Sequence, residues 1–64
     1  MANWLNENNA AEGQTVEMSG SPAKIVQVIP KMGIVVETQG AGMQMRITYL
    51  FTELSMIGAK IIEG

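Results

Sequence analysis

The side chains that perform most protein chemistry are scarce in this chain. It has no histidine and no cysteine, so it lacks the usual general base and the commonest zinc ligands. Neither an Asp-rich calcium loop nor a phosphate-binding glycine loop is present in the sequence. The acidic residues are all glutamates, and no pair has a spacing that predicts acid–base catalysis: Glu7, Glu12, Glu17, Glu37, Glu53 and Glu63. We therefore expect no enzymatic activity, no metal, no cofactor and no small-molecule substrate.

The basic residues offer a different chemistry, which is contact with phosphate groups. The chain has four lysines and arginines and a net charge of −2. Three of them, Lys24, Lys31 and Arg46, could form a small patch with Tyr49 as the aromatic on which a base stacks. The opposing interpretation is that these cations only solvate the outer surface and protect strand edges. Weak binding of RNA or single-stranded DNA is therefore the alternative functional hypothesis.

Short strands must position these residues. Five segments have strand patterns, namely residues 14–18, 23–29, 34–38, 43–49 and 57–63. The second and third are rich in β-branched residues, which favour a pleated surface. The fourth alternates strictly and predicts a half-buried strand with these side chains on its inner face: Met43, Met45, Ile47 and Tyr49. Residues 50–55 break the alternation and suit a single helical or 3₁₀ turn.

The order of these elements resembles the SH3-like small β-barrels, in particular the KOW and Tudor type. The resemblance covers Val16 to Leu54, where a glycine-containing loop, a turn at Gly33 and a turn before the last strand fall at the corresponding places. It implies an all-β fold, a small five-stranded SH3-like barrel over residues 14–64. A polar N-terminal arm, residues 1–13, precedes the barrel, and a short 3₁₀ turn precedes the last strand. Members of this family bind RNA, protein surfaces or copies of themselves, and an Sm-like barrel is a second analogy of fold.

Two of the predicted strands are apolar on both faces. Along the second strand, Val26 and Val28 would lie on one face and Ile25 and Ile29 on the other, and the third strand repeats this pattern around Val35. A small barrel buries one face only, so the second apolar face needs a cover. The alternative is that strand twist leaves a few tolerated Val and Ile side chains on the surface.

These observations favour a protein interface. We predict that it includes Trp4, Leu5, Val26, Val28, Met32 and Val35. A chain of 64 residues has a marginal core, and without cysteine the remaining stabiliser is a partner subunit. We therefore expect a non-enzymatic protein-interaction or structural module, acting as a homo-oligomer or as a docking domain. The absence of cysteine and of an apolar run of about 20 residues agrees with a cytoplasmic location.

Overall fold

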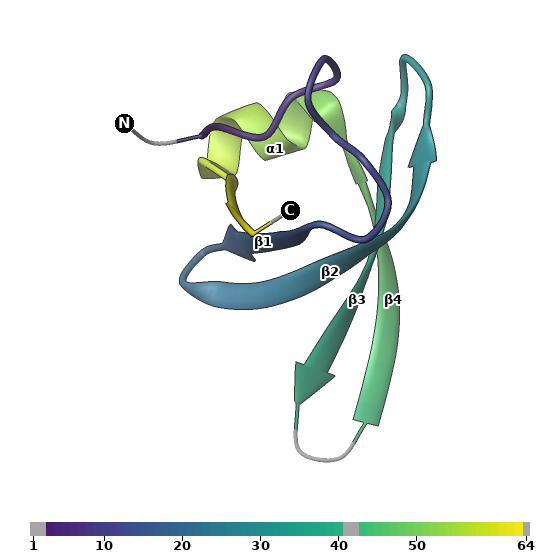
Figure 1. Ribbon diagram of the computed structural model, residues 1–64, viewed down its shortest axis with the longest axis vertical. Helices are drawn as coiled ribbons and strands as arrows, with labels where there is room; N and C mark the ends of the chain where they lie inside the picture. Colours follow the sequence, from purple (N-terminus) through teal and green to yellow (C-terminus); the bar gives the residue numbers. More distant parts are fainter. Residues whose placement is uncertain (1–2, 41–42, 64) are drawn as a thin grey trace.

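The computed structural model describes residues 3–40 and 43–63, which form five strands and one helix (Figure 1). In chain order the elements are β1 Thr15–Met18, β2 Ser21–Ile29, β3 Gly33–Gly40, β4 Met43–Leu50, α1 Phe51–Ile57 and β5 Lys60–Glu63. Every strand pair is antiparallel, and the strands lie in one sheet in the order β4-β3-β2-β1-β5. The predicted five-stranded, mainly β architecture is confirmed.

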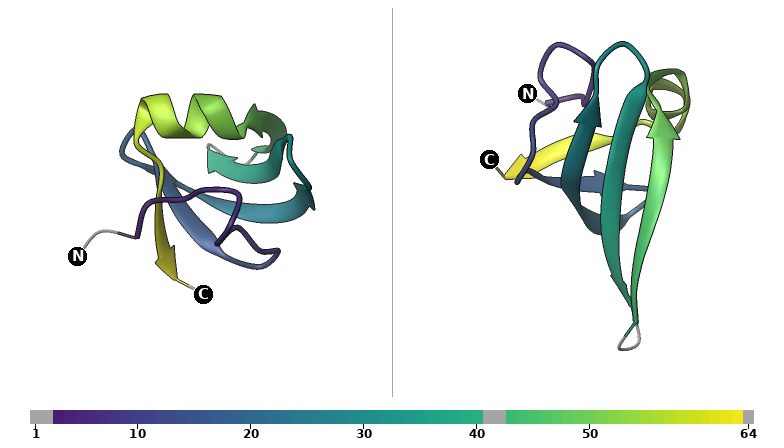
Figure 2. Two further views of the ribbon diagram at one scale, coloured as in Figure 1. Left: turned by 90° about the horizontal axis from the view of Figure 1, so that it is seen from above. Right: turned by 90° about the vertical axis from the view of Figure 1, so that its right-hand side faces the viewer.

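β2 is the longest strand and belongs to both halves of the sheet. Its first residues pair with β1, and from Ala23 onward it also pairs with β3. The sheet bends along this strand, so β1 and the start of β2 cross the direction of β3 and β4 (Figures 1 and 2). α1 faces the inner side of the bent sheet, as the view from above shows (Figure 2). The core therefore lies between the helix and the concave face.

A β-bulge at Val26 decides which side chains of β2 face that core. The register with β3 shifts between Ile25 and Gln27, so Val26 is the extra residue. Ile25 before the bulge and Val28 after it both lie opposite buried residues of β3, and cross-strand neighbours share one face. The predicted separation of Ile25 and Val28 onto opposite faces is therefore wrong, because strict alternation does not continue through a bulge.

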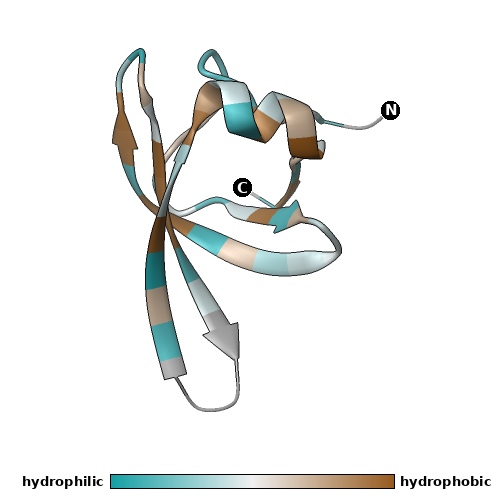
Figure 3. Ribbon diagram, turned by 180° about the vertical axis from the view of Figure 1, so that it is seen from behind, coloured by the Kyte–Doolittle hydropathy of each residue, from teal (hydrophilic) through white to brown (hydrophobic). Residues whose placement is uncertain are grey.

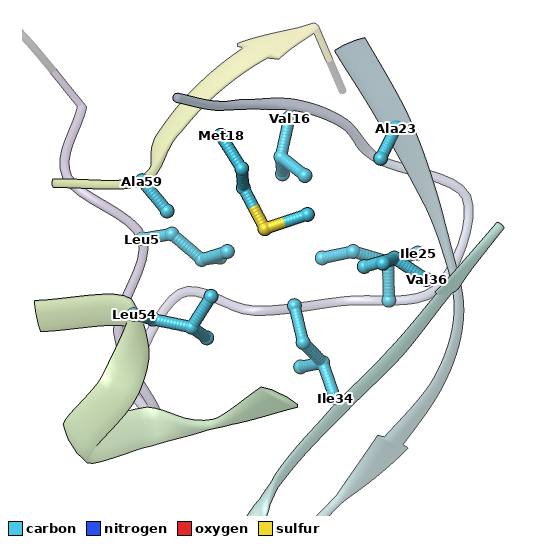
Figure 4. Packing of buried hydrophobic residues seen from close by; sticks show 9 residues of the cluster. All are labelled: Leu5, Val16, Met18, Ala23, Ile25, Ile34, Val36, Leu54 and Ala59. Atoms are coloured by element: carbon cyan, nitrogen blue, oxygen red, sulfur yellow. The ribbon is translucent and has the colours of Figure 1, made fainter. Parts of the chain in front are cut away.

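The core is one cluster of nine apolar side chains (Figure 4): Leu5, Val16, Met18, Ala23, Ile25, Ile34, Val36, Leu54 and Ala59. Three of them come from outside the strands: Ala59 lies just before β5, and Leu5 and Leu54 come from the N-terminal arm and from α1. Leu5 and Leu54 both point into the cluster from the side opposite Ile25 and Val36 (Figure 4). The arm and the helix are therefore parts of the hydrophobic core, which the sheet alone would leave open to water.

The sheet does not close into a barrel within the described residues. β4 and β5 are its two edge strands and do not pair with each other, and α1 connects them. The predicted barrel closure is therefore not confirmed.

The segment before the last strand is an α-helix. Of the helical or 3₁₀ turn predicted at residues 50–55, the helical alternative is therefore confirmed and the 3₁₀ turn is wrong. α1 runs for seven residues because Leu54 is buried in the core and holds the helix against it. The helix ends at Gly58, which takes a left-handed φ of 71° and donates its N–H to the carbonyl of Leu54 at 3.1 Å.

The inward face predicted for residues 43–49 is confirmed at Ile47 and Tyr49, which pack against the core. At Met45 the face is as predicted but the burial is not, because its side chain is 54% exposed. The side chain of Met43 lies outside the described part of the chain. The β3–β4 hairpin extends beyond the core at this point (Figure 1), so the described residues cover Met45 only in part. The alternation itself is visible along the hairpin in Figure 3.

Gly33 is a position where a side chain cannot fit. A Cβ atom there would lie 2.0 Å from the carbonyl oxygen of Tyr49, which is backbone and cannot rotate away. We expect Gly33→Ala to lower the free energy of unfolding by about 3 kcal/mol, because β3 and β4 must separate to admit the methyl group. Urea denaturation followed by the fluorescence of Trp4 measures this. The control Gln27→Ala, on an exposed side chain, should change stability by less than about 0.5 kcal/mol; equal effects would contradict the steric argument.

Candidate interaction surfaces

The cations proposed for nucleic-acid contact are only partly brought together. Lys24 and Arg46 both flank Glu37 on the outer face, because each lies opposite this residue across a strand pair. The Nε of Arg46 lies 3.3 Å from a carboxylate oxygen of Glu37. One carboxylate between two cations lowers the positive potential that a phosphate would meet.

The other two members of that set lie elsewhere. Lys31 is in the turn between β2 and β3, where it takes a left-handed φ of 63°. Tyr49 lies on the inner face of β4, opposite the buried Ile34. The four predicted residues therefore form no single patch.

The residues predicted for a protein interface are also dispersed. Leu5 is 4% exposed and belongs to this chain's own core. Trp4 and Met32 are 54% and 56% exposed, on the arm and on the β2–β3 turn. Val26, Val28 and Val35 are half-buried in β2 and β3, and Val28 packs against the core. Of this set, Trp4 and Met32 are the members that present large apolar side chains to solvent.

The arm covers the outer edge of β5. The N–H of Leu5 donates to the carbonyl of Ala59 at 2.9 Å, and the N–H of Ile61 donates to the carbonyl of Asn3 at 2.8 Å. Trp4 forms an antiparallel bridge with Lys60, whose Nζ lies 5.6 Å from the centroid of the indole ring. The arm thus acts as a short sixth strand at this edge, held in addition by a cation–π contact.

Polar side chains fold the rest of the arm back on itself. Gln14 is 7% exposed, yet both ends of its amide are bonded, since its oxygen accepts from the N–H of Ala11 and its nitrogen donates to the carbonyl of Asn9. Asn9 in turn donates to the carbonyl of Trp4 at 2.8 Å. The side-chain amides of Asn6, Asn9 and Gln14 therefore build a defined loop, because each of them hydrogen-bonds to main-chain groups of the arm.

A groove of about 390 Å³ separates the arm from the helix. Trp4, Leu5 and Glu7 line it on the arm side, and Phe51 and Ser55 are among the residues that line it on the helix side. The lining of the groove is mainly apolar. Its polar groups are few and none points to a particular ligand.

The outer edge of β4 differs from that of β5. Phe51 donates its N–H to the carbonyl of Met32 at 3.0 Å, which continues the β3–β4 register by one pair. In an antiparallel pair, alternate residues direct their N–H and C=O groups to the same neighbour. Residues 45, 47 and 49 therefore point their backbone groups toward β3. The N–H of Leu50 points away and is bonded instead to the carboxylate of Glu53 at 3.0 Å, in agreement with this parity.

The even-numbered residues of β4, Gln44, Arg46 and Thr48, consequently direct their N–H and C=O groups to the open edge. Among residues 3–40 and 43–63, no segment pairs with that side of β4. Isolated edges usually carry protective features such as lysine, proline or a bulge. β4 has none of these, since it pairs with β3 in one unbroken register and its single charge, Arg46, is turned back to Glu37.

Sequence reasoning missed this edge. The alternation of residues 43–49 predicted a strand, but it could not show which neighbour the strand lacks. The scarcity of charge on this strand was the available indication.

Comparison with known proteins adds no functional assignment. A scan against protein-family models, a search of curated proteins and a search of solved structures each gave no match. Within the described residues, no three His, Cys, Asp or Glu side chains are grouped closely enough to hold a metal ion. No helix in that part of the chain is long and apolar enough to cross a membrane.

The contact between Lys60 and Trp4 can be tested with one variant that removes the cation and one that keeps it. We expect Lys60→Met to make the Ile61 amide exchange with solvent about two- to fivefold faster, because a cation–π contact of about 0.5–1 kcal/mol no longer holds the arm. Lys60→Arg keeps the cation and should exchange as the parent chain does. Hydrogen exchange measured by NMR gives both values. Equal acceleration in the two variants, or none in Lys60→Met, would show that the contact does not hold the arm.

Proposed function

We propose that this chain is a non-enzymatic protein-interaction module that accepts an extended strand along the outer edge of β4. One observation carries the proposal: the N–H and C=O groups of Gln44, Arg46 and Thr48 face an open edge, whereas the arm occupies the edge of β5. Adding a strand to an open sheet edge is a recurrent mode of protein recognition, in which main-chain hydrogen bonds provide much of the affinity.

The side chains beside this edge would provide selectivity. On the inner face, Met45 is 54% exposed and Tyr49 is half-buried, so an incoming strand gains apolar contact there. Methionine adapts its shape to a partner because its side chain is unbranched and polarizable. On the outer face, Arg46 and Thr48 offer polar contacts. A partner strand that alternates apolar and polar residues fits both faces.

The finer assignment to an SH3-like small barrel stays part of the proposal. Five antiparallel strands with a short helix directly before the last one support it. A cytoplasmic location also stays a proposal, supported by the cysteine-free sequence. The nucleic-acid alternative gains no support from the geometry, because Lys31 and Tyr49 lie apart from the outer-face cations and Glu37 offsets the charge of Arg46.

A proline at Thr48 tests the proposed edge. The N–H of Thr48 points to the open side, so Thr48→Pro removes an edge donor without removing a bond to β3. We would select peptides from a randomised twelve-residue display library on the purified parent chain. The selected peptides should bind at least tenfold more weakly to Thr48→Pro, as measured by isothermal titration calorimetry.

Thr48→Val is the matched control, because it keeps the shape and the N–H, and it should bind the peptides as the parent does. Circular dichroism confirms that both variants are folded. Bound peptides should shift the NMR amide signals of Gln44, Arg46 and Thr48. A library that yields no binder, or binders indifferent to Thr48→Pro, would refute strand addition at β4.

A further inference from the structure

We infer that the strand added at this edge is β4 of a second copy of the chain, running antiparallel, with Ile47 on the two-fold axis. This inference rests on the proposed function and specifies its partner. It follows from the edge geometry, the position of the only charge on β4, and the pattern of side chains on its two faces.

Closure of the β5 edge favours a symmetric dimer. A chain with two open edges can join head to tail, edge β4 to edge β5, and such contacts build rings or filaments. Here Leu5 and Asn3 already hydrogen-bond to the outer side of the segment that contains β5. The remaining open edge can pair only with another β4 edge, which is an isologous contact and stops at two copies.

Symmetry restricts the register of such a pair. A two-fold axis normal to the sheet places the inner face of one copy beside the inner face of the other. Odd-numbered residues must then lie opposite odd-numbered residues, and even-numbered opposite even-numbered. In such a register one residue lies at the axis, directly opposite the same residue of the second copy. The middle of β4 falls between Arg46 and Ile47. An axis at Arg46 would place two guanidinium groups directly opposite, which is destabilising. An axis at Ile47 keeps nearly the full overlap of the strands and avoids this repulsion.

The resulting pairs are complementary on both faces. Arg46 lies opposite Thr48 of the second copy, and Thr48 lies opposite Arg46 of the second copy. The N–H and C=O groups that these residues direct to the open edge are therefore hydrogen-bonded in both pairs. On the inner face, Met45 lies opposite Tyr49 of the second copy, a sulfur–aromatic pair that covers the exposed methionine. Ile47 meets its own copy. The guanidinium of Arg46 stays against Glu37 and leaves the edge free of net charge.

Sedimentation equilibrium of the purified chain tests the dimer. We expect the weight-average mass to approach twice the chain mass of 6.9 kDa as the concentration rises through the micromolar range. Thr48→Pro should weaken dimerisation at least tenfold, and Thr48→Val should leave it unchanged. A parent chain that remains monomeric to millimolar concentration would overturn self-pairing. If the selected peptides still bound the parent and not Thr48→Pro, the proposed function would stand with a different partner.

Single-cysteine variants test the register, since the natural chain has no cysteine. In an antiparallel pair of this parity, Ile47 and its copy form a non-hydrogen-bonded pair with Cα atoms about 4.5 Å apart, within reach of a disulfide. Ile47→Cys should therefore form a covalent dimer in a glutathione redox buffer at least tenfold faster than Arg46→Cys or Thr48→Cys. These two positions are offset from their own copies by two residues, too far for a disulfide. Faster oxidation at position 46 or 48, or equal rates at all three, would overturn the register.

Discussion

The bulge at Val26 is the constraint on which the rest of this fold depends. Because it adds one residue to β2 alone, the strand bends and twists there, and its two ends can serve different halves of the sheet. It also returns Val28 to the inner face, so β2 contributes to the core before and after the bend. Without this extra residue, Val28 would face solvent and the concave side would lose an apolar side chain next to Ile34.

Bending the sheet has a consequence for its two edges. β5 ends up beside the N-terminal arm, whose Leu5 enters the core while its backbone pairs with Ala59. One residue therefore buries apolar surface and closes an edge at the same time. β4 lies at the opposite end of the sheet, and α1 follows it directly in the chain. The two edges therefore differ because the N-terminal arm pairs with the β5 edge and not with the β4 edge.

The sequence predicted the strands well because β-branched runs and strict alternation are local properties. All five predicted strand segments overlap the observed ones, and Ile47 and Tyr49 lie on the face that alternation assigns them. The failures are non-local. The bulge at Val26 depends on the register with β3, the length of α1 depends on burial of Leu54, and the exposure of Met45 depends on how far the hairpin extends past the core.

The candidate surface was harder to predict for the same reason. An edge is defined by the neighbour a strand lacks, and no pattern within residues 43–49 reveals this. The predicted interface set relied on apolar residues such as Leu5, which the chain uses for its own core. The small core receives part of its cover from within the chain, since the arm places Leu5 in it. What the sequence did contain was the near-absence of charge on β4, a feature that natural edge strands avoid.

The far half of the β3–β4 hairpin connects folding to association. Met45 is 54% exposed and its cross-strand neighbour Thr38 is only half-buried, so the described residues leave this part of the hairpin incompletely covered. Strands gain stability mainly from cross-strand and same-face packing, and here such packing is available only from outside. A partner strand at the β4 edge would bind the folded hairpin and not the unfolded chain, so by mass action it would stabilise the whole domain. In a chain with so small a core, the open edge would then serve the fold as well as the interaction.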